Sequence, residues 1–293
     1  MKKLLALALA AGMVFSMAAC GSTDDSSSDT ADISADAEDT SAEDADTSAE
    51  DADTASDTDS DLDYITEKGT LVVGVTDFEP MDYLDENGEW IGFDADMAAA
   101  FAESLGVEVE FIEIDWDNKI LELNNKSIDC VWNGMTLTDE VTSSMDCSNA
   151  YSSNSQVVVL SADIADQYSD LESLSDLTFA VESGSAGEAA AEDNGLNYTP
   201  VSSQAGALME IAAGTSDAAV IDLLMAEAMV GEGTSYDNLT TGLVLVDEEY
   251  GVGFRQGSDL VSLLNDFFAE SYGNGTMTEI AAEYGIEDSI IAQ

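Results

Sequence analysis

The stretch that decides the fold is SIDCVWNGMTLTDEVTSSMDCSNAY, residues 127–151. Its apolar run, residues 128–132, is short enough for a buried strand, and Asn133-Gly134 then predicts a turn where backbone can approach a ligand closely. Thr136 and Thr138 place hydroxyls where a helix would start, a position suited to anchoring a small anion. A strand, a backbone-lined turn and a helix N-terminus in this order are typical of ligand sites in open α/β sheets.

The same stretch resembles the polar amino acid family of periplasmic-type solute-binding proteins. That family carries an Asp-rich strand end, then G-x-T-x-T-x-E-R, then Asp-Phe-Ser-x-x-Tyr. The residues that fit are Gly134, Thr136, Thr138, Glu140, Asp146, Ser148 and Tyr151. Val141 stands where the family places the Arg that grips the substrate carboxylate, and Cys147 replaces the Phe. The match therefore has a break at the position expected to hold the ligand carboxylate.

Short β-rich runs alternate with helical patterns beyond residue 62, which indicates an α/β fold. Strands are expected at 71–75, 107–114, 128–132, 156–160, 177–181, near 198, and at 217–221, 243–246 and 251–254. Helices are expected at 92–106, 117–124, from Gly187, and at 207–214, 259–271 and 277–284. Residues 85–88, DENG, predict a hairpin turn between residues 81–83 and 90–93.

The resemblance covers Leu71 to Ile286 and implies a two-lobe periplasmic-binding-protein (Venus-flytrap) fold with two crossing hinge strands. Lobe 1 would comprise residues 62–151 plus 249–293, and lobe 2 residues 152–248. Roughly 230 residues is large for a single core, which agrees with two lobes.

Residues 1–19 have a basic start, an apolar core and small residues at the end, which predicts a secretory signal peptide. MAAC-GS resembles a bacterial lipobox and implies lipidation of Cys20, with palmitate-type chains that anchor the protein on the extracellular face of the cell membrane. Ordinary cleavage near Ala19 with free secretion is the alternative. Residues 20–61 are almost wholly Asp, Glu, Ser, Thr, Ala and Gly, which predicts a disordered acidic linker.

Charge and residue usage exclude several functions. Removal of residues 1–19 leaves 4 basic against 62 acidic residues, a net charge of −58 that disfavours any nucleic-acid partner. The sequence has no His, which excludes Ser-His-Asp and Cys-His nucleophiles and HExxH sites. Cys130 and Cys147 lack metal-type spacing and are expected to be two buried thiols rather than a disulfide. We expect no metal and no cofactor.

The resemblance implies ligand contacts in several segments. The candidate residues are Asp77, Phe78, Trp116, Lys119, Asn133, Gly134, Thr136, Ser185, Ala186 and Asp222. Trp116 would be an aromatic lid that excludes water and favours a cation through its π face. Lys119, three residues further on, is the nearest replacement for the missing Arg. Asp222 matches the acidic residue that pairs with a substrate α-ammonium.

Each candidate also has an ordinary structural role to weigh. Phe78 could be a core residue and Asp77 a turn residue. The Ser185 loop could be a plain turn that opens a helix, and Asp222 could be the N-cap of the helix LLMAEAMV. Asp77, Asp222, an aromatic lid and one nearby Lys suit a zwitterion or a cation better than a dicarboxylate.

The function that the resemblance implies is that of a monomeric, lipid-anchored binding component of an ABC importer. It would hold a polar amino acid or close analogue by closure of two lobes, dock on a membrane permease and catalyse no reaction. One alternative is an enzyme resembling the cyclohexadienyl dehydratases on the same fold, in which a carboxylate would have to act as the general acid. The other is a non-transport surface or sensory binding protein.

Overall fold

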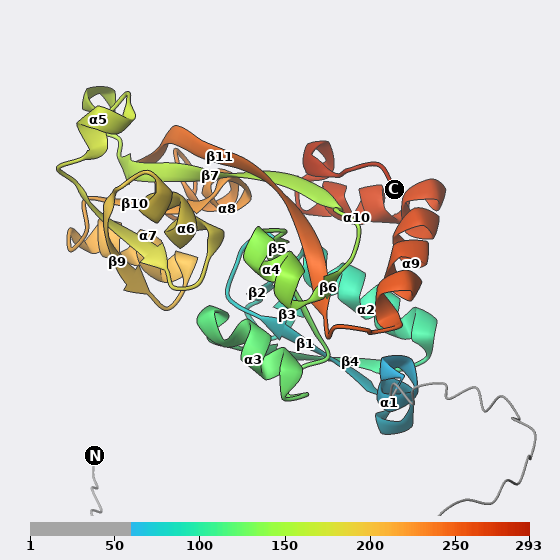
Figure 1. Ribbon diagram of the computed structural model, residues 1–293. Helices are drawn as coiled ribbons and strands as arrows, with labels where there is room; N and C mark the ends of the chain where they lie inside the picture. Colours follow the sequence, from blue (N-terminus) through green and yellow to red (C-terminus); the bar gives the residue numbers. More distant parts are fainter. Residues whose placement is uncertain (1–59) are drawn as a thin grey trace, which may run out of the picture. The chain divides into compact units, whose positions relative to one another are not determined.

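The computed structural model describes residues 60–293 (Figure 1). The expected signal peptide, the Cys20 lipidation site and nearly all of the acidic linker lie outside these residues. Among the described residues, none of the helices combines the length and apolar character that a membrane span needs.

A mixed sheet of nine strands organises residues 60–293, in the order β4-β1-β5-β11-β7-β10-β8-β9 with β6 beside β11. The strands are β1 (Thr70–Val75), β4 (Glu108–Glu113), β5 (Cys130–Thr136), β6 (Asp146–Cys147), β7 (Ser152–Ser161), β8 (Thr178–Glu182), β9 (Asn197–Val201), β10 (Ala218–Asp222) and β11 (Leu239–Phe254). β4, β1 and β5 are parallel, and so are β10, β8 and β9. β7 and β11 are antiparallel to each other and stand between these two groups.

The helices divide in the same way. Four helices precede or follow β1, β4 and β5 along the chain, namely α1 (Asp61–Lys68), α2 (Phe93–Leu105), α3 (Lys119–Asn124) and α4 (Asp139–Ser144). Two more, α9 (Leu260–Asn274) and α10 (Thr276–Glu283), follow β11, and α10 contacts α2. Those that accompany β8, β9 and β10 are α5 (Leu171–Leu174), α6 (Ala186–Asp193), α7 (Gln204–Ala213) and α8 (Leu223–Met229). Figure 1 shows the long strands β7 and β11 running between the two groups. The predicted two-lobe α/β class is therefore confirmed, while the exact lobe boundaries stay a prediction.

Local sequence signals explain much of this pattern. Phe93, Met97 and Phe101 are buried at helical spacing in α2, which ends at Gly106 in a left-handed conformation, as expected. The expected hairpin is also present, with β2 (Tyr83–Leu84) antiparallel to β3 (Trp90–Ile91). These elements form where apolar periodicity and turn residues agree.

β11 differs from the prediction. We expected two strands, at 243–246 and 251–254, but one strand of 16 residues runs from Leu239 to Phe254. The polar residues 247–249 that suggested a gap pair instead with residues 153–155 of β7. A backbone ladder does not require apolar side chains, so the hydrophobic pattern stops while the strand continues.

Asn133-Gly134 was also predicted wrongly, as a turn. β5 continues through it to Thr136, and the pairing with β11 shifts between Gly251 and Gly253, so the dipeptide lies in a bulge. Gly134 has φ +54°, and a Cβ atom there would lie 2.3 Å from a ring carbon of Phe78. Only glycine fits this position without strain. Thr138, by contrast, caps α4 as expected by accepting the Val141 N–H.

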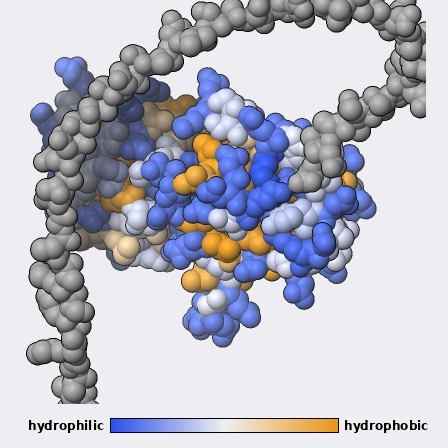
Figure 2. Space-filling view, turned by 60° about the horizontal axis from the view of Figure 1, so that its bottom comes forward, coloured by the Kyte–Doolittle hydropathy of each residue, from blue (hydrophilic) through white to orange (hydrophobic). Residues whose placement is uncertain are grey.

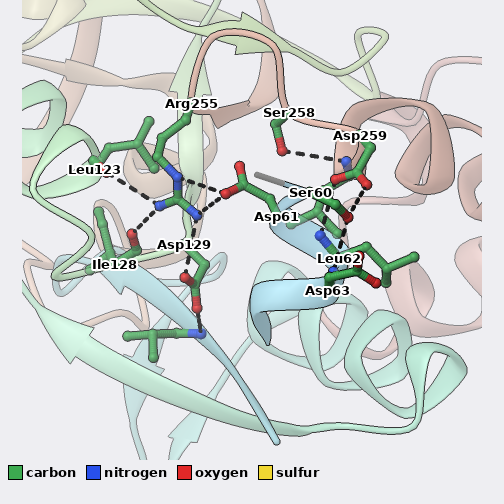
Figure 3. A network of polar contacts seen from close by, with 12 residues as sticks. Ser60, Asp61, Leu62, Asp63, Leu123, Ile128, Asp129, Arg255, Ser258 and Asp259 are labelled. Carbon is green, nitrogen blue, oxygen red and sulfur yellow. Dashed lines mark hydrogen bonds and ion pairs between the residues drawn. The ribbon is translucent and has the colours of Figure 1, made fainter. Parts of the chain in front are cut away.

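α1 was not predicted and is held by a set of charges, which we call the Arg255 cluster: Asp61, Lys68, Asp129 and Arg255. Figure 3 shows Asp61, Asp129 and Arg255 of this cluster. Arg255 Nε and Nη2 donate to Asp61 Oδ1 at 3.0 and 2.8 Å, and Nη2 lies 3.5 Å from Asp129 Oδ1. Lys68 Nζ lies 2.5 Å from Asp129 Oδ2. The cluster ties the start of α1 to β5 and to the end of β11.

Ser60 adds a second tie at the same place. Its hydroxyl donates to Asp259 at 2.6 Å and accepts the Asp63 N–H as the N-cap of α1. The Leu62 N–H also donates to Asp259, at 3.0 Å.

The face of the molecule in Figure 2 is mainly hydrophilic, and the two cysteines of residues 60–293 form no disulfide with each other. Figure 2 shows a face on which hydrophilic residues surround smaller hydrophobic patches, as expected for a chain with such an acidic excess. Cys130 is buried, Cys147 is half-buried, and both are free.

Candidate functional site

A cavity of about 210 Å³ lies where β5, α4 and α3 meet the β8–α6 loop and the end of β10. Its walls therefore come from both halves of the sheet. Most of the residues predicted from the sequence line it, namely Trp116, Lys119, Asn133, Gly134, Thr136, Ser185, Ala186 and Asp222. The topology brings them together because β5, β8 and β10 all end at this point.

Asp77 and Phe78 are not among the residues that line the cavity. Asp77 is exposed, whereas its neighbour Thr76 does line the cavity. Phe78 is buried, packs edge-on against Tyr250 and lies against Gly134. The Phe78 N–H donates to the Asp82 carbonyl, which holds this tight turn in place.

Trp116 and Lys119 form one wall. Lys119 Nζ lies 4.9 Å from the centroid of the Trp116 ring and donates to Gly184 O at 2.8 Å and to Trp116 O at 3.3 Å. The bond to Gly184 joins α3 to the β8–α6 loop across the cavity. Burial lowers the pKa of Lys119, and the carboxylates of Glu140 and Glu182 oppose that shift.

The Asn133 side chain is fully engaged within the protein. Its Oδ1 accepts from the backbone and hydroxyl of Thr76, and its Nδ2 donates to Thr76 O and to Asp82. The Gly134 N–H donates to Asp94 Oδ2 at 2.6 Å. Burial raises the pKa of Asp94 to about 7, and burial together with Asp94 raises that of Asp82 well above its ordinary value. These contacts fix the bulge and leave backbone rather than side chain for a ligand.

The loop before α6 is also internally bonded. Ser185 Oγ accepts the Glu188 N–H and so caps the helix, and a Glu188 carboxylate oxygen accepts the Gly184 N–H at 2.7 Å. The first N–H groups of α6, from Ala186 onward, have no intrahelical acceptor and carry the positive end of the helix dipole. Ala186 lines the cavity, so this end of α6 can receive an anion.

Asp222 sits in a shell of hydrogen-bond donors. Its Oδ1 accepts from Tyr250 OH at 2.7 Å, from Asn154 Nδ2 at 2.5 Å and from Gln156 Nε2 at 3.0 Å, and its Oδ2 accepts from Gln204 Nε2. Burial nevertheless raises the pKa of Asp222. Asp222 precedes α8 but makes no capping bond, because Asn154 accepts the Leu224 N–H instead. Asp222 is thus the N-cap residue of α8, as the alternative predicted, but its carboxylate is left free of capping.

Glu182 lines the cavity and was missed by the sequence analysis. It is 3% exposed, and its Oε1 has no hydrogen-bond partner within residues 60–293. Burial and the nearby charge of Asp222 raise the pKa of Glu182 to about 8, while Lys119 and the Gln204 amide oppose the shift. An acid that closes the apolar run LTFAV just before a glycine-containing loop was the available signal.

Val141, at the position of the missing Arg, is 4% exposed. It lines the cavity and belongs to an apolar cluster with Trp116 and Met145. The wall is therefore apolar at the position where the resemblance in sequence implied a cation.

A sequence model of the bacterial extracellular solute-binding proteins, family 3, matches residues 71–287. The chain belongs to this family. The match covers the whole sheet from β1 to the helices that follow β11, so every wall of the cavity lies inside it.

This family 3 solute-binding protein is similar to proteins that differ in ligand or role, as three of them illustrate. The arginine-binding extracellular protein ArtP of Bacillus subtilis is 28% identical over 97% of this chain and 98% of its own. The ancestral amino acid-binding protein AncCDT-1, a precursor of cyclohexadienyl dehydratase, is 31% identical, with a TM-score of 0.71 over 77% of this chain and 99% of its own. An ABC uptake transporter substrate binding protein from Streptococcus pneumoniae, solved with bound histidine, is 27% identical, with a TM-score of 0.71 over 77% of this chain and 96% of its own.

Proposed function

We propose that this chain is the amino-acid-binding component of an ABC importer, held at the cell surface by lipid on Cys20. The observation that carries the proposal is the cavity itself. Lys119, a cation, lines it from one half of the sheet, and Asp222, a carboxylate, lines it from the other half. A zwitterion needs one partner of each sign, and a ligand that touches both halves stabilises the closed form over the open one.

The ligand carboxylate would be held by Lys119, the Thr136 hydroxyl and the first N–H groups of α6. Lys119 Nζ already donates to two carbonyls, which leaves one of its three protons for the ligand. Val141 cannot contribute, because it is apolar. This arrangement would replace the bidentate contact that an Arg makes.

The ligand ammonium would be held by Asp222. Three donors already reach its Oδ1, but only one reaches Oδ2 among the described residues. A carboxylate offers about four acceptor positions, so Oδ2 retains capacity for an ammonium N–H. The shell of amides and the Tyr250 hydroxyl fixes the orientation of the carboxylate.

Thermal-shift screening against the common amino acids, ornithine, cystine and short amines tests the proposal. A ligand at 100 times its dissociation constant adds about 2.7 kcal/mol to the free energy of unfolding. For a folded region of this size that corresponds to a rise in Tm of about 5–10 °C. If no amino acid raised Tm, the proposal would fail, and a rise with aspartate or glutamate alone would overturn the assignment of the cavity charges.

Lys119→Ala tests the carboxylate contact by calorimetry with whichever amino acid gives the largest shift. We expect the dissociation constant to rise about tenfold or more, because the lost contact is charge-assisted and largely desolvated. Lys126→Ala removes the same charge from an exposed residue and should leave affinity unchanged. Equal affinity of the Lys119 variant and the natural protein would refute the role of Lys119.

An enzyme on this fold is the second candidate, favoured by the likeness to AncCDT-1 and by one residue. Glu182 is a buried carboxyl whose pKa of about 8 would keep a proton available near neutral pH. Incubation with prephenate and with arogenate, followed by detection of the aromatic products, separates the candidates. We expect no turnover by the natural protein, and turnover that disappears in Glu182→Gln would favour the enzyme.

The anchor is tested separately in a cell that exports the protein. We expect the natural chain in the membrane fraction and Cys20→Ala in the medium or the soluble fraction. A Cys20→Ala protein that stayed in the membrane fraction would contradict lipid anchoring without bearing on the binding function.

A further inference from the structure

The cavity wall carries more acid than base. Its ionisable residues are one base, Lys119, and the acids Asp139, Glu140, Glu182 and Asp222. Asp139 and Glu140 are exposed, so water screens their charges, whereas Glu182 and Asp222 are buried. A simple zwitterion requires one buried acid, and this wall has two.

The two buried acids differ in what surrounds them. Asp222 accepts hydrogen bonds from three amides and the Tyr250 hydroxyl. Glu182 is equally buried, but its Oε1 has no partner among the described residues. A buried carboxyl oxygen without a partner is costly. Asp82, Asp94 and Asp129 also have one such oxygen each, but only Glu182 of these four acids lines the cavity, where a ligand can supply the missing donor.

We propose that Glu182 is the specificity-determining residue of the cavity and selects an amino acid with a second positive charge. A cationic nitrogen of the ligand side chain donates to Glu182 Oε1, while Asp222 holds the α-ammonium and Lys119 the α-carboxylate. This inference rests on the proposed function, because it assumes that the cavity binds an amino acid. Dibasic amino acids fit this pattern, whereas a dicarboxylate would bring a third negative group beside Glu182 and Asp222.

The protonation of Glu182 gives the proposal a second signature. Without a bound ligand, burial and the charge of Asp222 hold the pKa of Glu182 at about 8, against the opposing effects of Lys119 and the Gln204 amide. Glu182 is then mostly protonated at pH 6. A cationic ligand favours the ionised form, so its binding releases a proton and tightens as pH rises toward 8.

Calorimetry with L-arginine and L-citrulline tests the selection, because the two side chains have similar size and differ in charge. We expect the natural protein to bind arginine at least tenfold more tightly than citrulline at pH 7.5. Glu182→Gln should weaken arginine binding about tenfold or more, which is about 1.4 kcal/mol, and leave citrulline binding unchanged or tighter. L-lysine and L-ornithine repeat the test with an ammonium in place of the guanidinium.

Glu140→Gln is the matched control, because it removes a carboxylate of the same kind from an exposed part of the same wall. We expect it to change the arginine-to-citrulline ratio by less than about threefold, since solvent screens exposed charges. A ratio that fell equally in both variants would mean that overall negative charge, not Glu182, selects the ligand, and would overturn the proposal.

Proton release is measured by repeating the arginine titration at one pH, near 7, in two buffers of different ionisation enthalpy. We expect the natural protein to release a proton that Glu182→Gln does not release. Amino acids that bind the natural protein and Glu182→Gln alike would sink the inference but leave the proposed function standing. Failure of every amino acid to bind the natural protein would instead remove the proposed function.

Discussion

The Arg255 cluster and the cavity both bury carboxylates, but they surround them differently. In the cluster, Asp61 and Asp129 face Arg255 and Lys68, so each buried acid has a basic partner from the protein. In the cavity, Asp222 faces amides and a phenol, and Glu182 has an oxygen with no partner among residues 60–293. Asp129 Oδ1 also lacks a hydrogen bond, but Arg255 Nη2 lies 3.5 Å from it, whereas Glu182 forms no ion pair within residues 60–293.

The placement of the basic residues sharpens this difference. Lys68, Lys126 and Arg255 all lie over the ring of Tyr64, at 4.8, 4.6 and 5.9 Å from its centroid. Lys119 alone among the bases of the described range lines the cavity. Three of the four bases within residues 60–293 therefore lie where α1 is held. The balance of charges in the Arg255 cluster therefore stabilises the fold, whereas the unbalanced acids of the cavity suit the binding of a ligand.

Arg255→Met is the most severe test of the comparison. It leaves Asp61 buried without its basic partner and removes one of the two bases beside Asp129, so we expect the free energy of unfolding to fall by about 3–5 kcal/mol in urea denaturation. Arg255→Lys keeps the charge but cannot donate to several acceptors at once, so it should lose less. A loss below about 1 kcal/mol in Arg255→Met would mean that the cluster does not hold the fold.

Glu182→Gln probes the other side of the comparison through pH. The pKa of Glu182 is raised from 4.5 to about 8, so its contribution to stability is present below about pH 4.5 and is lost as pH rises through 8. Between pH 5 and 8.5 the ligand-free natural protein should lose on the order of 2–4 kcal/mol more than the variant. Asp94, Asp222 and Glu248 also have raised pKa values, and their contribution remains in both proteins. Parallel stability curves would show that Glu182 is not held protonated.

Tyr250→Phe removes one of the hydrogen-bond donors to Asp222, so this carboxylate has one partner fewer from the protein. The lost bond, at 2.7 Å, goes to a buried carboxyl, so we expect the free energy of unfolding to fall by about 1.5–3 kcal/mol. Affinity for the ligand should fall as well, because Asp222 loses part of its fixed orientation. Unchanged stability together with unchanged affinity would indicate that the remaining amides suffice.

Lys126→Gln should give the smallest effect. Lys126 is exposed and contacts the Tyr64 ring only through its charge, so the loss should stay below about 1 kcal/mol. A loss as large as that of Arg255→Met would contradict the view that the paired buried charges, and not the basic patch as a whole, stabilise this region.

The parts of the fold that were predicted are those with a strong local pattern. The apolar spacing and the terminal Gly106 define α2, and the DENG turn defines the β2–β3 hairpin. α1 was missed because it follows an acidic tract and buries only Asp61 and Ile65, so its stability comes from ion pairs with distant residues. The prediction divided the long strand β11 in two, because residues 247–249 are polar and backbone pairing produces no hydrophobic pattern in the sequence.

Residues of the site could be predicted where they belong to a segment that resembles the family. Trp116, Gly134, Ser185 and Asp222 all line the cavity, whereas Phe78 is a core residue and Asp77 is exposed beside it. Glu182 matches no motif. Its importance comes from burial, from its nearness to Asp222 and from an oxygen without a partner, and none of these can be derived from sequence.

The ties made by Ser60 and Asp61 have a consequence for shortening the chain. These residues are the last two of the predicted acidic linker, yet Ser60 donates a hydrogen bond to Asp259 and Asp61 accepts two from Arg255. A chain cut before Ser60 keeps every one of these bonds. A chain cut after Asp61 loses these hydrogen bonds, and Arg255 then has no acceptor where Asp61 stood. Moving the point of cleavage by two residues thus decides whether the shortened protein keeps its stability or loses part of it.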